Sequence, residues 1–583
     1  MAEEPTELRR VNWSECFAFT HIFRTFRMAI HPSKLGLALA AILLTILWGG
    51  FLDLIWRAKC QPLKGEVNAF WQVPDIDVYR EATRIAQVGL IQRQYAKMGI
   101  EPPKDLENRF REKPAKVIDD ALYQQARQYE DRIEKADEIC KQRIEEAANK
   151  DEKRKLEETG RARIAEIARL HNEIRSDLES LGPQGVFISF ASFELAAIHQ
   201  LMDAGRRLNF AGRLSEVLGA RSTPEMEAAS VGTGLGGIGV LPCVALMLRG
   251  IQWLVLEHWF FALLLGLVSL AIWSLLGGAI CRIAALNVAS DERISPKAAL
   301  SFARRKFFGF FTGPLLPVGM VLAIGFFLFV GGLVGAIPYA GEILVGAGLF
   351  LALLGGFVMA LVIVGAVAGG SLLWPTIAVE GSDSFDAMSR SYSYVYSKPW
   401  RAALYAAVAT VYGALTYLFA RLFVLILLKA TRLFVNLGIV GLGLFGNHRP
   451  GTGVAGAKKL DAMWPHPTFE NLIPPGAAFG AENWDAGGAF LIQIWLFIVV
   501  GLLCAFLVSF YFSGSTVIYY LLRREVDATD LEDVYLEEGE ELEEPAPAAA
   551  PAAEVGAPAE PAGPPEPSTG APPPPPAPPE EPQ

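Results

Sequence analysis

Residues 307–379 read FFGFFTGPLLPVGMVLAIGFFLFVGGLVGAIPYAGEILVGAGLFLALLGGFVMALVIVGAVAGGSLLWPTIAV. These 73 residues contain one charged side chain, Glu342. An apolar helix needs about 20 residues to cross the hydrocarbon core of a bilayer. We therefore expect two crossings here, at about 310–335 and 343–371, with a turn at residues 337–341. This stretch predicts an all-α, polytopic membrane protein.

The composition of the whole chain agrees with that prediction. The 583 residues are 52% hydrophobic and only 20% charged, whereas soluble proteins average about 25% charged residues. The composition excludes a wholly disordered chain, a disulfide-rich secreted scaffold and a strongly basic nucleic-acid-binding protein. We therefore expect the lipid bilayer as a partner and no nucleic acid.

Four further apolar stretches bring the predicted number of crossings to six. They lie at about 35–56, 253–280, 402–428 and 488–520. Residues 231–248 are a seventh apolar stretch that could be a span, a re-entrant segment or an interfacial helix. A full span would place the basic clusters on opposite sides of the membrane, so we favour the last two readings.

Lys and Arg near the ends of the crossings set their orientation, because cytoplasmic flanks carry an excess of both. With six crossings, four basic clusters fall on one side, which predicts a multi-pass protein of the bacterial inner (cell) membrane with both termini cytoplasmic. The first crossing has a basic flank and no small-residue cleavage site, so we expect an uncleaved signal anchor. The clusters are Arg9, Arg10, Arg24, Arg27 and Lys34; Arg282, Arg293, Lys297, Arg304, Arg305 and Lys306; Arg390, Lys398 and Arg401; and Arg523 and Arg524.

This topology divides the chain into segments with different environments. The expected segments are a cytoplasmic N-terminal segment (1–34), a signal-anchor helix (35–56), an extracytoplasmic helical domain (58–252), a five-helix membrane domain (253–522) with an outer loop (429–487), and a cytoplasmic tail (525–583). Within the outer loop, the apolar residues 433–446 are short and Gly-rich, so we expect them on the outer membrane surface.

The extracytoplasmic domain contains a highly charged stretch. In residues 101–180, 39 of 80 residues are charged, and apolar residues recur at spacings of three and four. This pattern predicts a long helical hairpin or coiled coil over about 110–181, with a bend at 150–160 and a shorter helix near 188–206. The hairpin could pack only on itself, or its seam could form a homo-oligomer or capture a protein partner.

The net charge of −10 is unevenly placed along the chain. The 16 acidic residues after Arg524 have no basic counterpart, so residues 1–524 alone carry +6. The tail is acidic and then Pro/Ala-rich, and it cannot bury enough apolar surface to offset its ordering entropy. We expect a disordered tail that either solvates the protein or docks to a proline-binding or basic partner.

A short motif occurs twice on the expected inner face. Ser295 and Asp383 are each a helix-capping residue before a short helical run that leads into the next crossing. The second run holds the candidate inner-face residues, and its tryptophan suits a membrane interface. These candidates are Asp383, Asp386, Ser389, Arg390, Trp400 and Arg401.

This second motif carries a family resemblance. Residues 377–387 (IAVEGSDSFDA), 389–392 (SRSY) and 399–401 (PWR) resemble a signature of uncharacterised bacterial multi-pass membrane proteins, over roughly 250–525. More loosely, they are similar to the membrane domain attached to some glycerophosphodiester phosphodiesterases, in which an Ala-x-x-x-Ser run and a Trp-Arg pair also sit between helices. The resemblance implies no reaction, since the His and Glu metal-site pattern of those hydrolytic domains has no counterpart in this chain.

Three ionisable residues lie in or beside the expected crossings. Glu257 and His258 could form an interfacial pair, or they could form a proton or cation site, since charges at mid-membrane depth are costly. Arg421 is expected to extend its guanidinium group to the membrane surface. We find no nucleophile–base pattern, no phosphate-binding loop and no zinc-ligand spacing, and therefore expect no catalytic residues, cofactor or metal.

Two functional hypotheses follow from these features. The first is a non-enzymatic membrane protein that acts as a scaffold, in assembly or envelope organisation, through its outer coiled coil and its tail. The alternative is a transporter or lipid-handling permease that uses the repeated transmembrane pairs. An enzyme is the weakest of the hypotheses.

Overall fold

The computed structural model describes most of the chain between residues 17 and 543. It describes residues 17–56, 62–63, 65–73, 75–147, 149–181, 185–206, 239–290, 293–441, 460, 464–469, 471–473, 484–536 and 542–543. The described residues are almost entirely helical, and a single pair of two-residue strands joins residues far apart in sequence.

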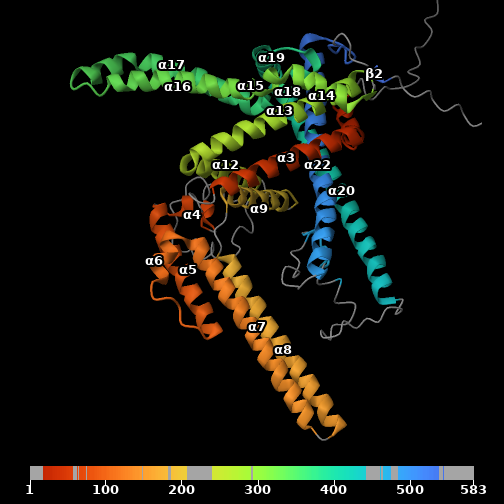
Figure 1. Cartoon of the computed structure of the whole chain (residues 1–583). Coiled ribbons are helices and arrows are strands. Elements are labelled where there is room, and N and C mark those ends of the chain that lie inside the picture. The colour runs from red at the N-terminus through yellow and green to blue at the C-terminus, as the bar shows by residue number, and fades with distance from the viewer. Residues whose placement is uncertain are drawn as a thin grey trace, which may run out of the picture.

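The helices fall into three consecutive groups (Figure 1). The first group is η1 (Ala18–Arg24), α2 (Thr25–Ala29) and α3 (Pro32–Trp56). The second is α4 (Glu66–Gln72), α5 (Ile76–Met98), α6 (Leu106–Glu112), α7 (Pro114–Glu146), α8 (Lys150–Ser180) and α9 (Val186–Arg206). The third is α12 (Val240–Glu257), α13 (Trp259–Ala289), α14 (Pro296–Arg305), α15 (Phe307–Thr312), α16 (Leu315–Val334), α17 (Ala340–Gly369), η2 (Gly370–Leu372), α18 (Leu373–Glu380), α19 (Ser384–Ser397), α20 (Pro399–Gly441) and α22 (Trp484–Asp527). Strand β1 (Arg293–Ile294) pairs antiparallel with β2 (Leu542–Glu543).

Seven of the described helices are long and apolar enough to cross a membrane, which fits a multi-pass membrane protein. They are Pro32–Trp56, Val240–Glu257, Trp259–Ala289, Leu315–Val334, Ala340–Glu380, Pro399–Gly438 and Phe490–Asp527. Six of them correspond to the six predicted crossings. The seventh is α12, which includes most of the ambiguous stretch 231–248; residues 231–238 lie outside the described part.

The main core lies where α13, α22 and α3 meet the short helices α14, α15, α18 and α19. We call this region the hub. Small residues on α13 make the close packing possible: a side chain at Gly277 would collide with the ring of Trp374, and one at Gly278 would meet Phe310. Trp374 in turn stacks on Phe512 of α22, with ring centroids 5.4 Å apart. The hub therefore brings residues near 280, 377 and 515 into one packed layer.

Long helices leave the hub in different directions (Figure 1). Helices α16 and α17 pack on each other and otherwise touch the hub through α15, α19 and η2. Helices α20 and α22 form a second pair. The outer ends of α3 and α13 carry α4, α9 and α12 in a separate apolar cluster that includes Leu52 and Trp253. Helices α7 and α8 project beyond this cluster as a two-helix arm, which we call the arm.

Several predicted boundaries agree with the structure. The turn at 337–341 separates α16 from α17, and its Tyr339 has a left-handed backbone, with φ 63°. The helical hairpin over about 110–181 is present as α7 and α8, and the predicted helix near 188–206 is α9. Ser295 and Asp383 both cap helices, by accepting the backbone N–H of Ala298 and of Asp386.

Other boundaries were wrong. The predicted crossing at 253–280 is interrupted at His258, where α12 ends and α13 begins. Helix α7 ends at Glu146 and α8 begins at Lys150, so residues 150–160, where the bend was predicted, are the first part of α8. Residues 433–441 do not form a separate surface segment; they continue α20, because none of its glycines has to end the helix. Residues 442–446 lie outside the described part.

The predicted tail begins too early. Residues 525–527 are the last turn of α22, and residues 528–536 fold back on the hub. Residues 542–543 form the strand that pairs with Arg293 and Ile294. The remaining tail, from 544 onward, lies outside the described part.

Candidate functional site: the Glu380 layer and two other polar clusters

The densest polar cluster of the hub surrounds Glu380, the last residue of α18. Its carboxylate lies 2.6 Å from Nη1 of Arg390 and 3.3 Å from Nε of Arg523, and it accepts a hydrogen bond from the hydroxyl of Tyr519. The Glu380 side chain is only 8% exposed. One buried carboxylate thus connects α18, α19 and α22.

The chain after Glu380 is built to hold this geometry. Gly381 ends α18 with φ +63°, in the left-handed region that favours glycine. Asp383 then caps α19, and Asp386 lies one turn before Arg390, with its Oδ2 3.1 Å from Nε of Arg390. Arg390 is therefore held between two carboxylates.

A second pair of carboxylates fastens the end of α22 to α19 and α20. Glu525 lies 2.7 Å from Nη1 of Arg401 and accepts a hydrogen bond from Tyr405. Asp527 accepts a hydrogen bond from Tyr394. Burial, and then the Asp527 carboxylate, raises the pKa of Tyr394 above its ordinary value. These contacts make the predicted motif part of a structural layer.

Two of the predicted motif residues stand outside this layer. Ser389 is exposed on α19, and Trp400 is 86% exposed at the start of α20. An exposed tryptophan at the end of a candidate span suits the polar boundary of a bilayer. The six predicted residues are therefore of two kinds. These two side chains are exposed, and the other four form hydrogen bonds or ion pairs: Asp383, Asp386, Arg390 and Arg401.

The segment 528–536 closes the layer, and we call it the latch. Tyr535 donates its backbone N–H to the carbonyl of Val379 at 2.9 Å, and its own carbonyl accepts Nη2 of Arg282 at 2.7 Å. Arg282 is fully buried; its Nη1 donates to the carbonyl of Ala378 at 2.8 Å, and its guanidinium carbon lies 4.3 Å from the centre of the Phe302 ring. The latch therefore supplies an acceptor to a buried cation.

Sequence reasoning used Arg282 and Arg523 only as orientation signals and gave no role to Glu380, Tyr519 or Tyr535. A signal was present for Arg282, because it lies within a long apolar run, where a cation must find partners. No such signal exists for Tyr535, which lies in a segment of polar composition.

A second cluster contains the predicted Glu257 and the unpredicted Arg80. Arg80 of α5 lies 2.6 Å from Glu66 and 2.8 Å from Glu257, so its guanidinium group bridges α4 and the end of α12. His258 packs edge-on against Trp253, with ring centroids 5.0 Å apart. Glu257 is thus one member of an ion-pair cluster that joins α12 to the second helical group.

The third predicted ionisable residue, Arg421, does not extend to the surface as expected. It is buried on α20, where its Nε donates to the carbonyl of Phe469 at 2.9 Å. Arg432, three turns further along α20, donates to the carbonyl of Trp464 at 3.0 Å and contacts His466. Arg421 finds its acceptor in a chain segment that covers it, so it needs no contact with water.

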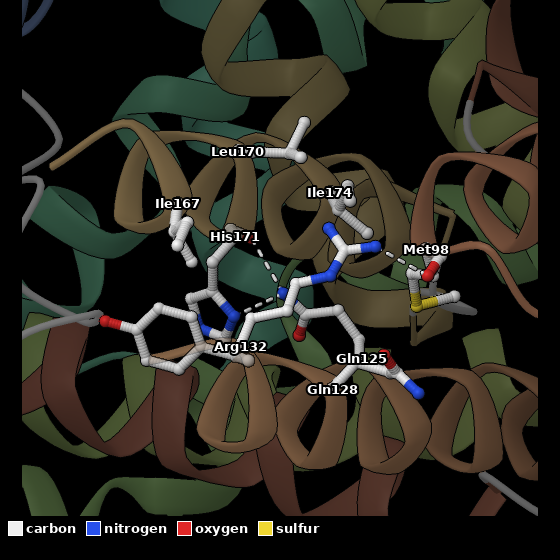
Figure 2. A pocket seen from close by; sticks show the side chains of 9 residues that line it. Met98, Gln125, Gln128, Arg132, Ile167, Leu170, His171 and Ile174 are labelled. Carbon is white, nitrogen blue, oxygen red and sulfur yellow. Dashed lines mark hydrogen bonds between the residues drawn. The ribbon is translucent and has the colours of Figure 1, made fainter. Parts of the chain in front are cut away.

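The arm has a polar contact at its root (Figure 2). Gln125 of α7 donates to the carbonyl of His171 on α8 at 2.8 Å, and Arg132 reaches the carbonyl of Met98 at 2.8 Å. The cavity between these side chains is about 20 Å³, which is room for about one water molecule. This site is too small for an organic ligand, so we assign it to positioning the two helices.

These clusters share one chemical property. Their polar groups are bonded within the protein: the carboxylates to cations or tyrosine hydroxyls, and Arg421, Arg432, Gln125 and Arg132 to backbone carbonyls, which suits a structural role better than proton transfer. Among the described residues, no three His, Cys, Asp or Glu side chains are grouped so that they could hold a metal ion. Comparison of the chain with protein-family models, with curated proteins and with solved structures finds no match.

Proposed function

We propose that this chain is a non-enzymatic membrane scaffold that assembles with further copies of itself through the arm. The observation that carries the proposal is the difference between the root and the tip of the arm. At the root, Ile118 and Ala121 of α7 and Leu178 of α8 are buried against α5 and α6. Beyond Gln125 on α7, and before Ile174 on α8, no side chain that the structure describes is fully buried.

The tip of the arm is therefore a pair of helices with a partly covered apolar seam. Ile139 is 47% exposed there, and Ile133 and Ile144 are only partly covered. Isolated helix pairs gain little from such a seam, whereas added helices bury it further. Residues 101–180 carry 18 basic and 21 acidic residues, so a second arm can approach with little net repulsion.

Co-purification of two differently tagged copies of the full-length chain tests this proposal. We expect the wild-type copies to co-purify and Ile139→Glu to reduce co-purification severalfold, because it places a charge on the apolar seam. Asn108→Glu is the matched control, since it adds the same charge to an exposed site on α6. Equal co-purification of both variants and the wild type, or a wild type that stays monomeric, would refute assembly through the arm.

We also propose the predicted orientation, with the hub and both termini on the cytoplasmic side of a bacterial inner membrane. This orientation rests on six crossings, and it therefore requires α12 to lie at the membrane surface rather than to cross the bilayer. Trp71 donates to the carbonyl of Arg249 in mid-helix at 3.3 Å, and Glu257 at the helix end bonds to Arg80. Both contacts reach the second helical group, which supports an interfacial α12 and six crossings.

Labelling of single cysteines in intact cells tests the orientation. In a variant without its natural cysteines, Gln142→Cys on the arm should react with a membrane-impermeant maleimide, while Ser389→Cys on α19 should react only after lysis. Both positions are exposed, so access is set by the side of the membrane. Protection of the cysteine at 142 in intact cells would overturn this topology.

The alternative of a transporter has less support from the contacts. A transport site needs ionisable or polar groups that are free to bind a substrate at mid-membrane depth. Of the Glu257/His258 pair that such a site would use, Glu257 is bonded to Arg80, and His258 packs edge-on against Trp253. We therefore place the scaffold first, with the acidic, Pro-rich tail as a second site for a protein partner.

A further inference from the structure

A cavity of about 180 Å³ lies where η1 and α2 meet the ends of α13 and α22. Its polar lining is provided by His21, Arg24, Arg27 and Asn287, and its apolar lining includes Val288 and Leu521. Among the described residues, no acidic side chain lines it. This cavity belongs to neither the Glu380 layer nor the arm.

The sequence before α3 explains why the cations point into the cavity. Residues 17–27 read FAFTHIFRTFR, in which aromatic and basic side chains are interleaved. In the 3₁₀-helix η1, residues three apart share a face, which places His21 and Arg24 together. The aromatic side chains anchor the segment: Phe23 lies 5.0 Å from Tyr412 and Phe26 lies 5.9 Å from Phe506, between ring centroids. The segment is thus held on α20 and α22 by its rings, which leaves its cations for the cavity.

Four nearby arginines, on α13, α19, α20 and α22, have bonded partners. Arg282, Arg390, Arg401 and Arg523 each bond to a carboxylate or a carbonyl. Among the described residues, neither Arg24 nor Arg27 forms an ion pair or a side-chain hydrogen bond. Burial, and then the charges of Arg24 and Arg524, lowers the pKa of His21. Within the part of the chain that the structure describes, the cavity is therefore lined by positive charge that no acidic side chain balances.

The position of the cavity indicates which anion fits it. Asn287 lies three residues before Ser290, which follows α13, and α3 begins at Pro32, so the cavity lies at the ends of two candidate spans. Polar headgroups occupy this depth in a bilayer. Guanidinium groups match phosphate oxygens in geometry and charge, and the apolar lining suits the glycerol and acyl part of a lipid.

We propose that this cavity binds a phosphate group, carried by an anionic phospholipid or present as the free anion. Arg24 and Arg27 neutralise the phosphate. Binding fixes the segment before α3 against the ends of α13 and α22.

Native mass spectrometry of the purified full-length chain in detergent tests this proposal, with dioctanoyl phosphatidylglycerol as the probe. Each basic side chain near an anionic surface contributes about fivefold in affinity. Arg24→Gln/Arg27→Gln should therefore weaken binding by about 25-fold. The matched control is Arg304→Gln/Lys398→Gln, which removes two exposed cations outside the cavity lining and should leave the affinity unchanged. If the double variant fails to fold, Arg27→Gln alone should still weaken binding about fivefold.

Two further measurements identify the source of the phosphate. Displacement of the lipid by millimolar inorganic phosphate would support a site for the free anion. Retention of the lipid, with weaker binding of the zwitterionic dioctanoyl phosphatidylcholine, would support an anionic phospholipid. Equal affinity of the Arg24/Arg27 variant and the control pair would overturn the proposal. Binding that appears only after removal of residues 537–583 would also overturn it, in favour of the acidic tail as the occupant.

Discussion

Replacing Glu380 by glutamine tests whether the polar layer holds the hub together. The variant keeps the size of the side chain and an acceptor for the Tyr519 hydroxyl, but it removes the negative charge between two arginines. The two arginines should respond differently. Arg523 is 11% exposed and Arg390 is 44% exposed, so only the first is a largely buried cation.

The magnitude follows from these environments. Leaving a buried charge without its partner costs about 3–5 kcal/mol. Arg523 retains Asp533, whose Oδ2 lies 2.8 Å from its Nη2, and its Nε is not aligned for a hydrogen bond with Glu380, so we expect the lower end of that range. The exposed pair with Arg390 adds less than about 1 kcal/mol. Glu380→Gln should therefore destabilise the protein by about 3 kcal/mol, and Arg390→Gln by less than about 1 kcal/mol.

Reversible unfolding in mixed detergent micelles measures these free energies. Double-mutant cycles then isolate each pair, and we expect the coupling of Glu380 to Arg523 to exceed its coupling to Arg390 by more than about 1 kcal/mol. A cost below about 1 kcal/mol for Glu380→Gln, or equal coupling energies for the two arginines, would refute this reasoning.

Three further predictions address the latch and α9. A chain ending at residue 527 should lose about 2 kcal/mol of stability relative to one ending at 543, because buried Arg282 loses its bond to Tyr535; equal melting temperatures would contradict this. Asp53→Ala should cost about 1 kcal/mol and increase proteolysis within α9, since the Asp53 carboxylate accepts the first N–H groups of that helix; unchanged cleavage would contradict it. Burial raises the pKa of Glu194 to about 7, so the folded state favours its neutral form and stability should fall as pH rises from about 5 to 8; Glu194→Gln should flatten this melting profile, and an unchanged profile would contradict the assignment.

The parts of the fold that could be predicted depend on local sequence. Apolar runs of sufficient length marked six of the seven candidate spans, and Tyr339 lies in the turn predicted at 337–341. Capping by Ser295 and Asp383 was also predictable, because a capping side chain bonds to a backbone N–H three residues away. The family resemblance stays a prediction, as does the coiled-coil character of the arm.

The parts that could not be predicted depend on contacts between distant residues. Glu380 reaches Tyr519 and Arg523, which lie about 140 positions later, and no sequence period connects them. Arg421 was expected to extend to the membrane surface, because nothing in the sequence around Phe469 indicates that this segment covers Arg421 and accepts its hydrogen bond. The apolar stretch around 433 was separated from α20 because its glycines suggested a break, but glycine only weakens a helix and neighbouring contacts decide whether it ends.

The latch changes how the acidic residues after Arg524 are divided between the hub and the tail. Of the 16 acidic residues after Arg524, five lie in the described segment 525–536, so residues 1–536 carry +1 rather than the +6 of residues 1–524. Three of these five, Glu525, Asp527 and Asp533, bond to the hub. The first part of the acidic segment thus neutralises the layer around Glu380, and it does so without forming an ion pair with Arg24 or Arg27 among the described residues. An added anion would therefore gain at that cavity, where the described residues place no acidic side chain beside Arg24 or Arg27.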